Sequence, residues 1–209
     1  MFDHANSWPL ICSVCEGPLF TAQRVMRCNQ GHTFDIAREG YVNLLTARHA
    51  ERGITGDTRT MLHARRRFLD AGYFGPLLEL LAERVQHVLQ HVSGDPCIVE
   101  VGCGEGYYIG NLALETGKST ARQARYIGFD VSKDAVRLAA RRYKRVQFAV
   151  ANVRRRLYVA PGAVHVLLSI FAPRHPEEFR RIIAPDGRFI VVFPGYRHME
   201  HIRSRYELL

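Results

Sequence analysis

Four residues near the start of the chain have the types and the spacing of a zinc site. Cys12-Ser-Val-Cys15 is followed, after a turn-rich segment, by Cys28-Asn-Gln-Gly-His32. Each short pair presents two soft ligands from one turn, and Zn²⁺ binds thiolates and imidazoles in a tetrahedron at roughly 2.0–2.3 Å. Four protein ligands leave no open position, so we predict a structural zinc site that stabilises residues 1–45. The alternatives are unrelated core thiols or a disulfide.

A second candidate site is a glycine-rich bend in the middle of the chain. Cys97-Ile-Val-Glu-Val101 predicts a buried strand, and Gly102-Cys-Gly104-Glu105-Gly106 follows it. Glycines let a backbone turn sharply and approach a ligand closely, and open α/β sheets bind ligands at the carboxyl ends of their strands. The bend departs from the dinucleotide fingerprint because its third glycine comes one residue early. Glu100 would repel a pyrophosphate but suits a cofactor with an ammonium and a sulfonium, such as S-adenosylmethionine.

Polar residues also end the next two predicted strands. Asp130 closes the strand predicted over 126–130, where a carboxylate can accept hydrogen bonds from a ribose diol. The alternative role for Asp130 is to cap the next helix, although Ser132 could do that equally well. Asn152 follows the strand predicted over 146–150 and is placed to meet the edge of an adenine.

Composition narrows the classes of protein that the chain can belong to. The 209 residues carry a net charge of +9. No run approaches the roughly 20 apolar residues of a membrane span, and no secretory signal precedes Trp8, so we expect no membrane association. The remaining cysteines, Cys97 and Cys103, lie in or beside an apolar segment, which fits a reducing, cytoplasmic location. Each arginine cluster alone is explained by a solvated helix face, but the whole-chain excess beside a zinc module favours a nucleic-acid partner.

The chain divides into three zones, at 1–45, 46–93 and 94–209. The middle zone predicts helices over Thr58–Ala71, with Asp57 as its cap and Gly72 at its end, and over Phe74–Val92. The last zone alternates strands and helices, which predicts an α/β fold with a Rossmann-like parallel sheet. Further strands are expected at 164–170 and 188–193, helices at 107–115, 133–143 and 176–183, and a turn at 185–187.

Several of these motifs, in this order, resemble one family of enzymes. The stretches that carry the resemblance are Cys12 to Leu45, Gly56 to Tyr73, Val101 to Tyr108, Asp130 to Lys133 and Ile170 to Pro173. They are similar to the 23S rRNA (guanine-N1)-methyltransferases. The resemblance implies a class I methyltransferase sheet with a small zinc module, and Cys12, Cys15, Cys28 and His32 as the zinc ligands. It also implies transfer of a methyl group from S-adenosylmethionine to N1 of a guanine in a hairpin loop of 23S rRNA.

The same resemblance implies several contacts to the cofactor and the RNA. Gly104, Glu105 and His198 match cofactor contacts of the family, and Phe74 stands where the family has a tyrosine, so stacking survives without the hydroxyl. No residue is identified as a general base. Together with the residues above, the expected cofactor set is Phe74, Glu100, Gly102, Gly104, Glu105, Asp130, Asn152 and His198. Apart from the resemblance, Phe171, Ala172 and Pro173 are candidate walls of the guanine pocket. Phe34, Arg38 and Tyr41 are candidates to face the RNA, and the alternative, above all for Phe34, is that they pack the module against the main domain.

The chain also departs from the family pattern in ways that bear on activity. The segment Arg154-Arg155-Arg156-Leu157-Tyr158-Val159 stands where the family tends to have a short Leu-Pro-Phe run, and His165 stands where an acidic residue is usual. The resemblance further predicts that C-terminal strands of the family are missing after the fifth strand, which would then be an open edge able to pair with another chain and form a dimer. Two other functions therefore stay open: methylation of a small molecule, and RNA binding by an inactive relic.

Overall fold

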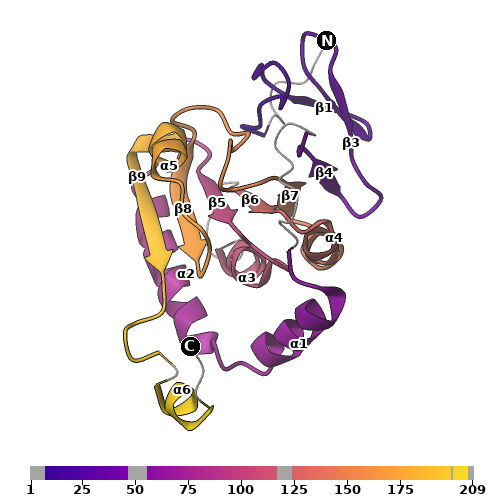
Figure 1. Cartoon of the computed structure of the whole chain (residues 1–209). Coiled ribbons are helices and arrows are strands. Elements are labelled where there is room, and N and C mark those ends of the chain that lie inside the picture. The colour runs from indigo at the N-terminus through magenta and orange to yellow at the C-terminus, as the bar shows by residue number, and fades with distance from the viewer. Residues whose placement is uncertain (1–7, 47–55, 117–123, 199, 207–209) are drawn as a thin grey trace.

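A six-stranded sheet organises the computed structural model, which describes residues 8–46, 56–116, 124–198 and 200–206 (Figure 1). The strand order is β4-β7-β6-β5-β8-β9, and every neighbouring pair is parallel, as predicted. The three central strands β5, β6 and β7 are almost wholly buried, because each is a short apolar run covered on both faces. The strands are β4 (Tyr41–Asn43), β5 (Cys97–Val101), β6 (Arg125–Asp130), β7 (Val146–Val150), β8 (Val164–Ile170) and β9 (Ile183–Val192).

Helices from the middle and last zones cover one face of this sheet. Residues of α2, α3 and α4 share a single buried cluster with the apolar residues of that face. The helices on this side of the sheet are α1 (Arg59–Asp70), α2 (Gly75–Leu89), α3 (Tyr107–Thr116) and α4 (Lys133–Arg142). The prediction that Asp57 caps α1 is wrong: the Thr58 side chain accepts the N–H of Met61 at 3.3 Å, and Asp57 instead forms an ion pair with Arg65.

The N-terminal module and one short helix cover the opposite face. The module is a three-stranded antiparallel sheet of β1 (Phe20–Ala22), β2 (Val25–Arg27) and β3 (Thr33–Asp35), and the helix is α5 (Pro176–Ile182). The connection from β7 to β8 contains no helix, and its Leu157 and Val159 are fully buried. Leu10 of the module bridges Val159, and the Ile11 N–H donates to the Tyr158 carbonyl at 3.0 Å. The module therefore buries a face of the sheet that a crossover helix would otherwise cover.

One strand links the module directly to the large sheet. β4 lies within the predicted zinc module, yet it pairs with β7 through Tyr41–Phe148, Val42–Ala149 and Asn43–Val150. Tyr41 is buried in the helix-covered core, so the expectation that it faces the RNA is wrong. Phe34 packs partly buried against the module's core, and Arg38 is exposed. The metal module and the sheet thus share one hydrophobic interior.

The last strand extends further than the sequence predicts. β9 begins at Ile183, directly after α5, so the expected turn at 185–187 lies within this strand. The expected turn coincides with an irregularity in the pairing with β8, where Val164 pairs with Ile183 but Val166 pairs with Arg188. β9 is the outermost strand of the described sheet, and α6 (Glu200–Tyr206) follows it. In the part of the chain that the structure describes, no helix combines the length and the apolar character of a membrane span.

Candidate cofactor and metal sites

The four predicted zinc ligands lie together. The nearest ligand atoms of Cys12, Cys15, Cys28 and His32 all fall within 4.8 Å of one another. The Cys28 Sγ lies 3.6 Å from the Cys15 Sγ and 3.3 Å from the His32 Nδ1. All five cysteines are unpaired in the structure, so the clustered thiols are arranged as metal ligands and not as a disulfide. Three thiols and one imidazole at these separations match the corners of a zinc tetrahedron.

The surroundings of Cys28 favour the charge state that a metal requires. Burial opposes ionisation of this thiol, but hydrogen bonds with Cys15 and His32 lower its pKa from 9.0 to about 6. A thiolate is the form that binds zinc. On the first turn of the site, the Cys12 N–H donates to the Gly17 carbonyl at 2.8 Å and holds the Cys12–Cys15 pair in place.

The glycine bend between β5 and α3 is fixed by its neighbours in the sheet. Gly102 and Gly104 have φ angles of +66° and +55°, a region that side chains strongly disfavour. A Cβ on Gly102 would lie 2.6 Å from the Cβ of Ala172 at the end of β8. The Gly104 N–H donates to the Asp130 Oδ2 at 2.8 Å, and the Cys103 N–H donates to the Phe129 carbonyl at 2.9 Å. The bend therefore rests on both β6 and β8.

Three carboxyl groups surround this bend, and burial raises the pKa of each. Glu100 is 1% exposed and accepts the Ile109 N–H at 2.9 Å in the first turn of α3; burial, with Asp130 and Glu105 nearby, raises its pKa to about 8. Burial likewise raises the pKa of Asp130, whose two oxygens accept the N–H groups of Gly104 and Ser132 at 2.8 Å each. Ser132 itself caps α4 through the Ala135 N–H.

Glu105 is held by a residue that the sequence did not single out. Its Oε2 lies 3.2 Å from the Arg66 Nε of α1, and burial raises its pKa although Arg66 opposes that shift. Its Oε1 is buried and has no hydrogen-bond partner among the described residues. A buried acceptor without a partner is uncommon in folded proteins and marks a place where a ligand donor fits.

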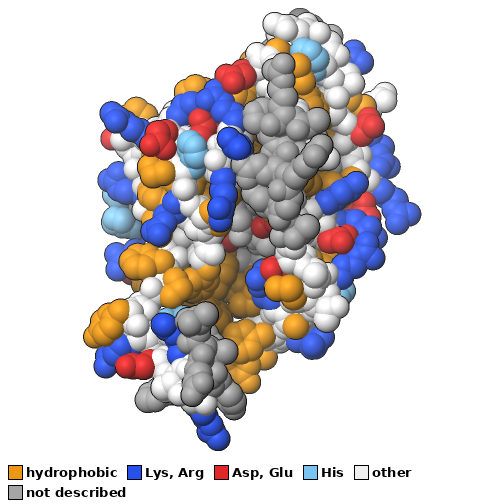
Figure 2. Space-filling model, in the orientation of Figure 1, with side chains coloured by type: hydrophobic (Ala, Val, Ile, Leu, Met, Phe, Trp, Pro, Cys, Tyr) orange, Lys and Arg blue, Asp and Glu red, His pale blue; other side chains and the backbone are white. Residues whose placement is uncertain are grey.

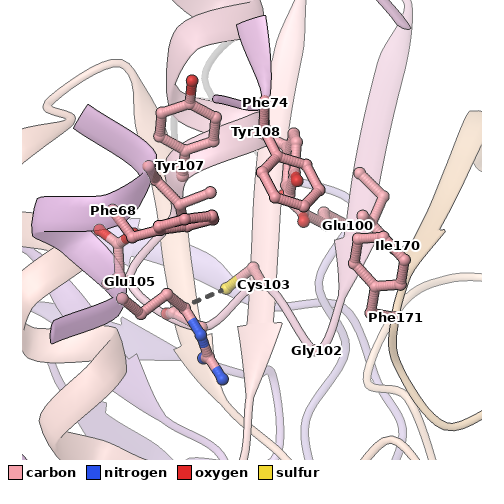
Figure 3. Close-up of a pocket in the computed structure, with 13 residues that line it drawn as sticks. Phe68, Phe74, Glu100, Gly102, Cys103, Glu105, Tyr107, Tyr108, Ile170 and Phe171 are labelled. Carbon is pink, nitrogen blue, oxygen red and sulfur yellow. Dashed lines mark hydrogen bonds between the residues drawn. The ribbon is translucent and has the colours of Figure 1, made fainter. Parts of the chain in front are cut away.

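A pocket of about 300 Å³ opens over the bend (Figure 3). Side chains from α1, from the β5–α3 bend and from the end of β8 face one another across it. The lining residues are Arg65, Phe68, Leu69, Phe74, Glu100, Gly102, Cys103, Gly104, Glu105, Tyr107, Tyr108, Ile170 and Phe171. The structure thus gathers five of the predicted cofactor residues, Phe74, Glu100, Gly102, Gly104 and Glu105, in one cavity.

The other three predicted cofactor residues lie outside the pocket lining. Asp130 reaches the bend through its hydrogen bond to Gly104. Asn152 is 3% exposed after β7; its Oδ1 accepts the Arg154 N–H, while its Nδ2 has no partner in the described structure. His198 is exposed beyond β9, where its N–H donates to the Gly195 carbonyl.

Sequence reasoning missed the wall that α1 contributes to the pocket. Arg65, Phe68 and Leu69 follow the i, i+3, i+4 spacing of one helical face, which was the available signal. Tyr107 and Tyr108 stand directly after the last glycine of the bend and also line the pocket. Their position directly after the glycine bend was the sequence signal that could have predicted this.

Known proteins match both parts of the chain. The family model described as "RlmA, N-terminal", a zinc ribbon, matches residues 10–51, and "Methyltransferase domain" matches residues 98–187. The 23S rRNA (guanine(748)-N(1))-methyltransferase of Streptomyces fradiae is 38% identical over 200 residues, which cover 96% of this chain and 68% of the relative.

The chain belongs to the 23S rRNA (guanine-N1)-methyltransferase family.

A second relative agrees with this assignment, and one solved structure shows the fold. A Micromonospora griseorubida relative, provisionally named as an enzyme of the same activity, is 39% identical over 216 residues, covering 96% of this chain and 70% of the relative. The solved structure of the DszA carbon methyltransferase aligns with 63% of this chain and 38% of its own, with a TM-score of 0.51 and 18% identity, which shows a shared fold. The α/β class I methyltransferase prediction is thereby confirmed, and the N-terminal module is the family's zinc ribbon with its Cys₃His cluster.

The two departures from the family pattern have structural roles in this chain. Arg156 pairs with Glu16 of the ribbon at 2.6 Å and with Glu178 of α5 at 2.9 Å, so it ties the ribbon to the methyltransferase domain. His165 accepts the Cys97 N–H of β5 through its Nδ1 at 3.1 Å, and burial lowers its pKa. A neutral imidazole at this position therefore joins β5 and β8 by a hydrogen bond.

Proposed function

We propose that this chain binds S-adenosylmethionine over the glycine bend and transfers its methyl group to N1 of a guanine in a hairpin loop of 23S rRNA. The observation that carries the proposal is the ring of buried carboxyl groups around the bend, formed by Glu100, Glu105 and Asp130. Such a ring suits a cofactor that carries an ammonium and a sulfonium. Because burial raises the pKa of Glu100 to about 8, the ring acts at neutral pH mainly through hydrogen-bond acceptors and not through charge repulsion by Glu100.

The hydrogen bonds of the bend argue the same way. A pyrophosphate site needs free backbone N–H groups at the start of the helix. Here the N–H groups of Cys103, Gly104 and Gly106 already donate to Phe129, Asp130 and Cys103 respectively. These three hydrogen bonds hold the shape of the bend, so the N–H groups involved are not free to bind a phosphate.

The polar atoms around the pocket suggest a role for each predicted cofactor residue. The unpartnered Oε1 of Glu105 can accept a hydrogen bond from the amino-acid part of the cofactor, and Asp130 keeps lone pairs free for a ribose diol. The unpartnered Nδ2 of Asn152 can donate to an adenine ring nitrogen. Phe74 supplies a surface on which the cofactor can stack, and Glu100 holds the start of α3 through the Ile109 N–H. His198 would contact the cofactor from the exposed segment after β9.

The chain contributes positioning to the reaction. Bound S-adenosylmethionine would supply a methyl group already activated by its sulfonium and would leave as S-adenosylhomocysteine, while the proton on guanine N1 is released to solvent. The pocket walls hold the acceptor base and exclude water from it, and such orientation contributes up to roughly 7–11 kcal/mol of rate acceleration. The guanine must leave its stack to reach the pocket, at a cost of about a few kcal/mol that is smaller in a loop than in a duplex. Phe171, at the end of β8, is the wall that such a base would meet.

Charge and the zinc ribbon support RNA as the substrate that carries this guanine. The net charge is +9, and Figure 2 shows lysine and arginine side chains spread over the visible face. We assign a role to each zone of the chain. Residues 1–45 bind the RNA hairpin, residues 46–93 supply α1 and α2, and residues 94–209 bind the cofactor.

The proposal is tested by incubating the purified chain with methyl-labelled S-adenosylmethionine and unmodified 23S rRNA. We expect label in the RNA and a steep loss of RNA affinity with rising salt, because several phosphate contacts release counterions. The Gly104→Val variant is the control for transfer at this site. A folded, cofactor-binding protein that labels no RNA would overturn the proposal, and undetectable cofactor binding would favour an inactive relic.

A further inference from the structure

Four aromatic rings form a continuous row from the surface into the pocket. Tyr73 and Phe68 are stacked, with ring centroids 4.9 Å apart and an angle of 25°. Phe68 meets Phe74 edge-on at 5.9 Å, and Phe74 meets Phe171 edge-on at 6.1 Å. Phe68, Phe74 and Phe171 line the pocket, and Tyr73 lies just outside that lining. The row joins the α1–α2 turn to the end of β8.

Much of this row faces solvent. Tyr73 is 70% exposed, Phe68 50% and Phe171 48%. Figure 2 shows hydrophobic side chains gathered around the hollow that lies between α1 and the ends of β8 and β9. Contiguous exposed apolar groups of this kind mark binding surfaces in soluble proteins.

The backbone at Phe171 is held in a strained conformation. Its φ is +53°, and a bulky side chain rarely adopts this region. The Phe171 N–H donates to the Val192 carbonyl of β9 at 2.9 Å and so fixes the conformation. Since the ring is half exposed, core packing does not account for the strain, and such strain concentrates at functional sites.

Arginines lie near the row. Arg65, which is paired with Asp57, lines the pocket from α1, and Arg67 on the same helix is exposed. Beyond Phe171, the Arg174 guanidinium lies 5.8 Å from the centre of the Phe193 ring. Aromatic rings with guanidinium groups beside them are the means by which proteins hold unpaired nucleotides, because bases stack on the rings while the phosphates meet the positive charges.

We propose that this row stacks unpaired bases of the RNA loop: the target guanine at Phe171 and a neighbouring base at Tyr73. The inference rests on the proposed function for its choice of RNA, and it goes further by naming the residues that grip the loop. It makes Tyr73 a substrate-positioning residue that lies away from the cofactor.

The test compares Tyr73→Ala with Tyr73→Phe, and uses Leu80→Ala, an exposed apolar residue of α2, as the matched control. The probe is a hairpin RNA with 2-aminopurine beside the loop guanine, whose fluorescence falls when the base stacks. We expect Tyr73→Ala to weaken hairpin binding on the order of tenfold, from the loss of one stacked base, and to abolish the quenching. Tyr73→Phe should restore both, and binding to a fully paired duplex and to S-adenosylmethionine should be unchanged.

Two results would overturn the inference. The first is wild-type affinity and quenching in Tyr73→Ala. The second is a change of sedimentation coefficient in that variant without a change in hairpin binding, which would show that a second copy of the chain covers the row. Failure of the wild-type protein to methylate RNA would count against the proposed function instead, because the quenching assay needs no turnover.

Discussion

Val42 of the zinc ribbon and Ala149 of the methyltransferase sheet are directly paired partners in a parallel ladder. Val42 is fully buried, and the ribbon residues Leu10, Met26 and Leu44 belong to the same core cluster as Val99 and Ile127 of the sheet, among others. The ribbon is therefore part of the structure that forms the cofactor site. Loss of the metal should therefore destabilise the neighbouring strands of the sheet as well as the ribbon.

The first prediction concerns Cys28→Ala, which removes one of the four zinc ligands. Because structural zinc contributes on the order of 10 kcal/mol to folding, we expect this variant to lose bound zinc and to unfold at a lower temperature. From the sequence alone, loss of zinc is expected to loosen only residues 1–45. From the structure we expect the amides of β7, which pair with β4, to exchange faster as well.

Zinc content by mass spectrometry and hydrogen exchange at residues 146–150 check this prediction. Cys97→Ala is a suitable control, because Cys97 is a buried thiol of β5 outside the metal cluster. One full equivalent of zinc in Cys28→Ala would refute the ligand assignment. Unchanged protection of β7 in the zinc-free variant would refute the shared core.

The second prediction concerns Gly104→Val, which places a side chain where φ is +55° and where a Cβ would lie 3.4 Å from the Arg65 Nη1. We expect loss of measurable S-adenosylmethionine binding by calorimetry. Gly162→Val is the matched control, because Gly162 has φ of +63° but open space around its Cβ. Both variants should lose about 1–2 kcal/mol of stability from the left-handed backbone, and only Gly104→Val should lose the cofactor. Normal cofactor affinity in Gly104→Val would exclude the bend as the binding site.

The third prediction concerns Arg66→Leu, which leaves the buried carboxyl of Glu105 without its partner. We expect S-adenosylmethionine affinity to fall about tenfold, because Glu105 would take up a proton or turn away from the pocket. Arg59→Leu, on the same helix, breaks a more exposed pair with Asp134 and should change neither affinity nor stability by more than about 1 kcal/mol. Equal affinities in the two variants would contradict the role given to Glu105.

The fourth prediction concerns the pH dependence of stability. The pKa of Glu100 rises from 4.5 to about 8 in the folded protein because of burial, so between these values the native state binds one more proton than the unfolded state. Its contribution to stability is therefore full below about pH 4.5 and is lost as the pH rises toward 8, at up to ~1.4 kcal/mol per pH unit.

Glu100→Gln is the variant that isolates this contribution. Its amide oxygen can still accept the Ile109 N–H, but the group no longer titrates. We expect its unfolding free energy, measured by denaturant titration, to fall less steeply from pH 5 to pH 8 than that of the wild type. Parallel profiles for the two proteins would show that Glu100 is already ionised at neutral pH.

The sequence predicts the central strands well, because each carries its own signal. Cys97–Val101 and Val146–Val150 are short apolar runs that the structure buries completely, and both boundaries are as predicted. The zinc cluster is equally predictable from the sequence, since its ligand pairs are local in the chain. Gly72 ends α1 as expected, with φ of +85°.

Several features that the sequence does not reveal depend on partners that are distant in the chain. β4 is three residues long, too short for any periodicity, and it is defined only by its pairing with β7. The pair Arg66–Glu105 joins α1 to the β5–α3 bend, and no local pattern marks it. Thr58 outcompetes Asp57 as the cap of α1 because Asp57 is engaged by Arg65.

The most direct test of the central claim is the identity and position of the product. After reaction of the purified chain with S-adenosylmethionine and unmodified 23S rRNA, the RNA is digested and its nucleosides and fragments are identified by mass spectrometry. We predict N1-methylguanosine at a single unpaired guanine of one hairpin loop, formed by the wild type and absent with Gly104→Val. Methylation of another base or another ring atom, or equal yields from the two proteins, would contradict it.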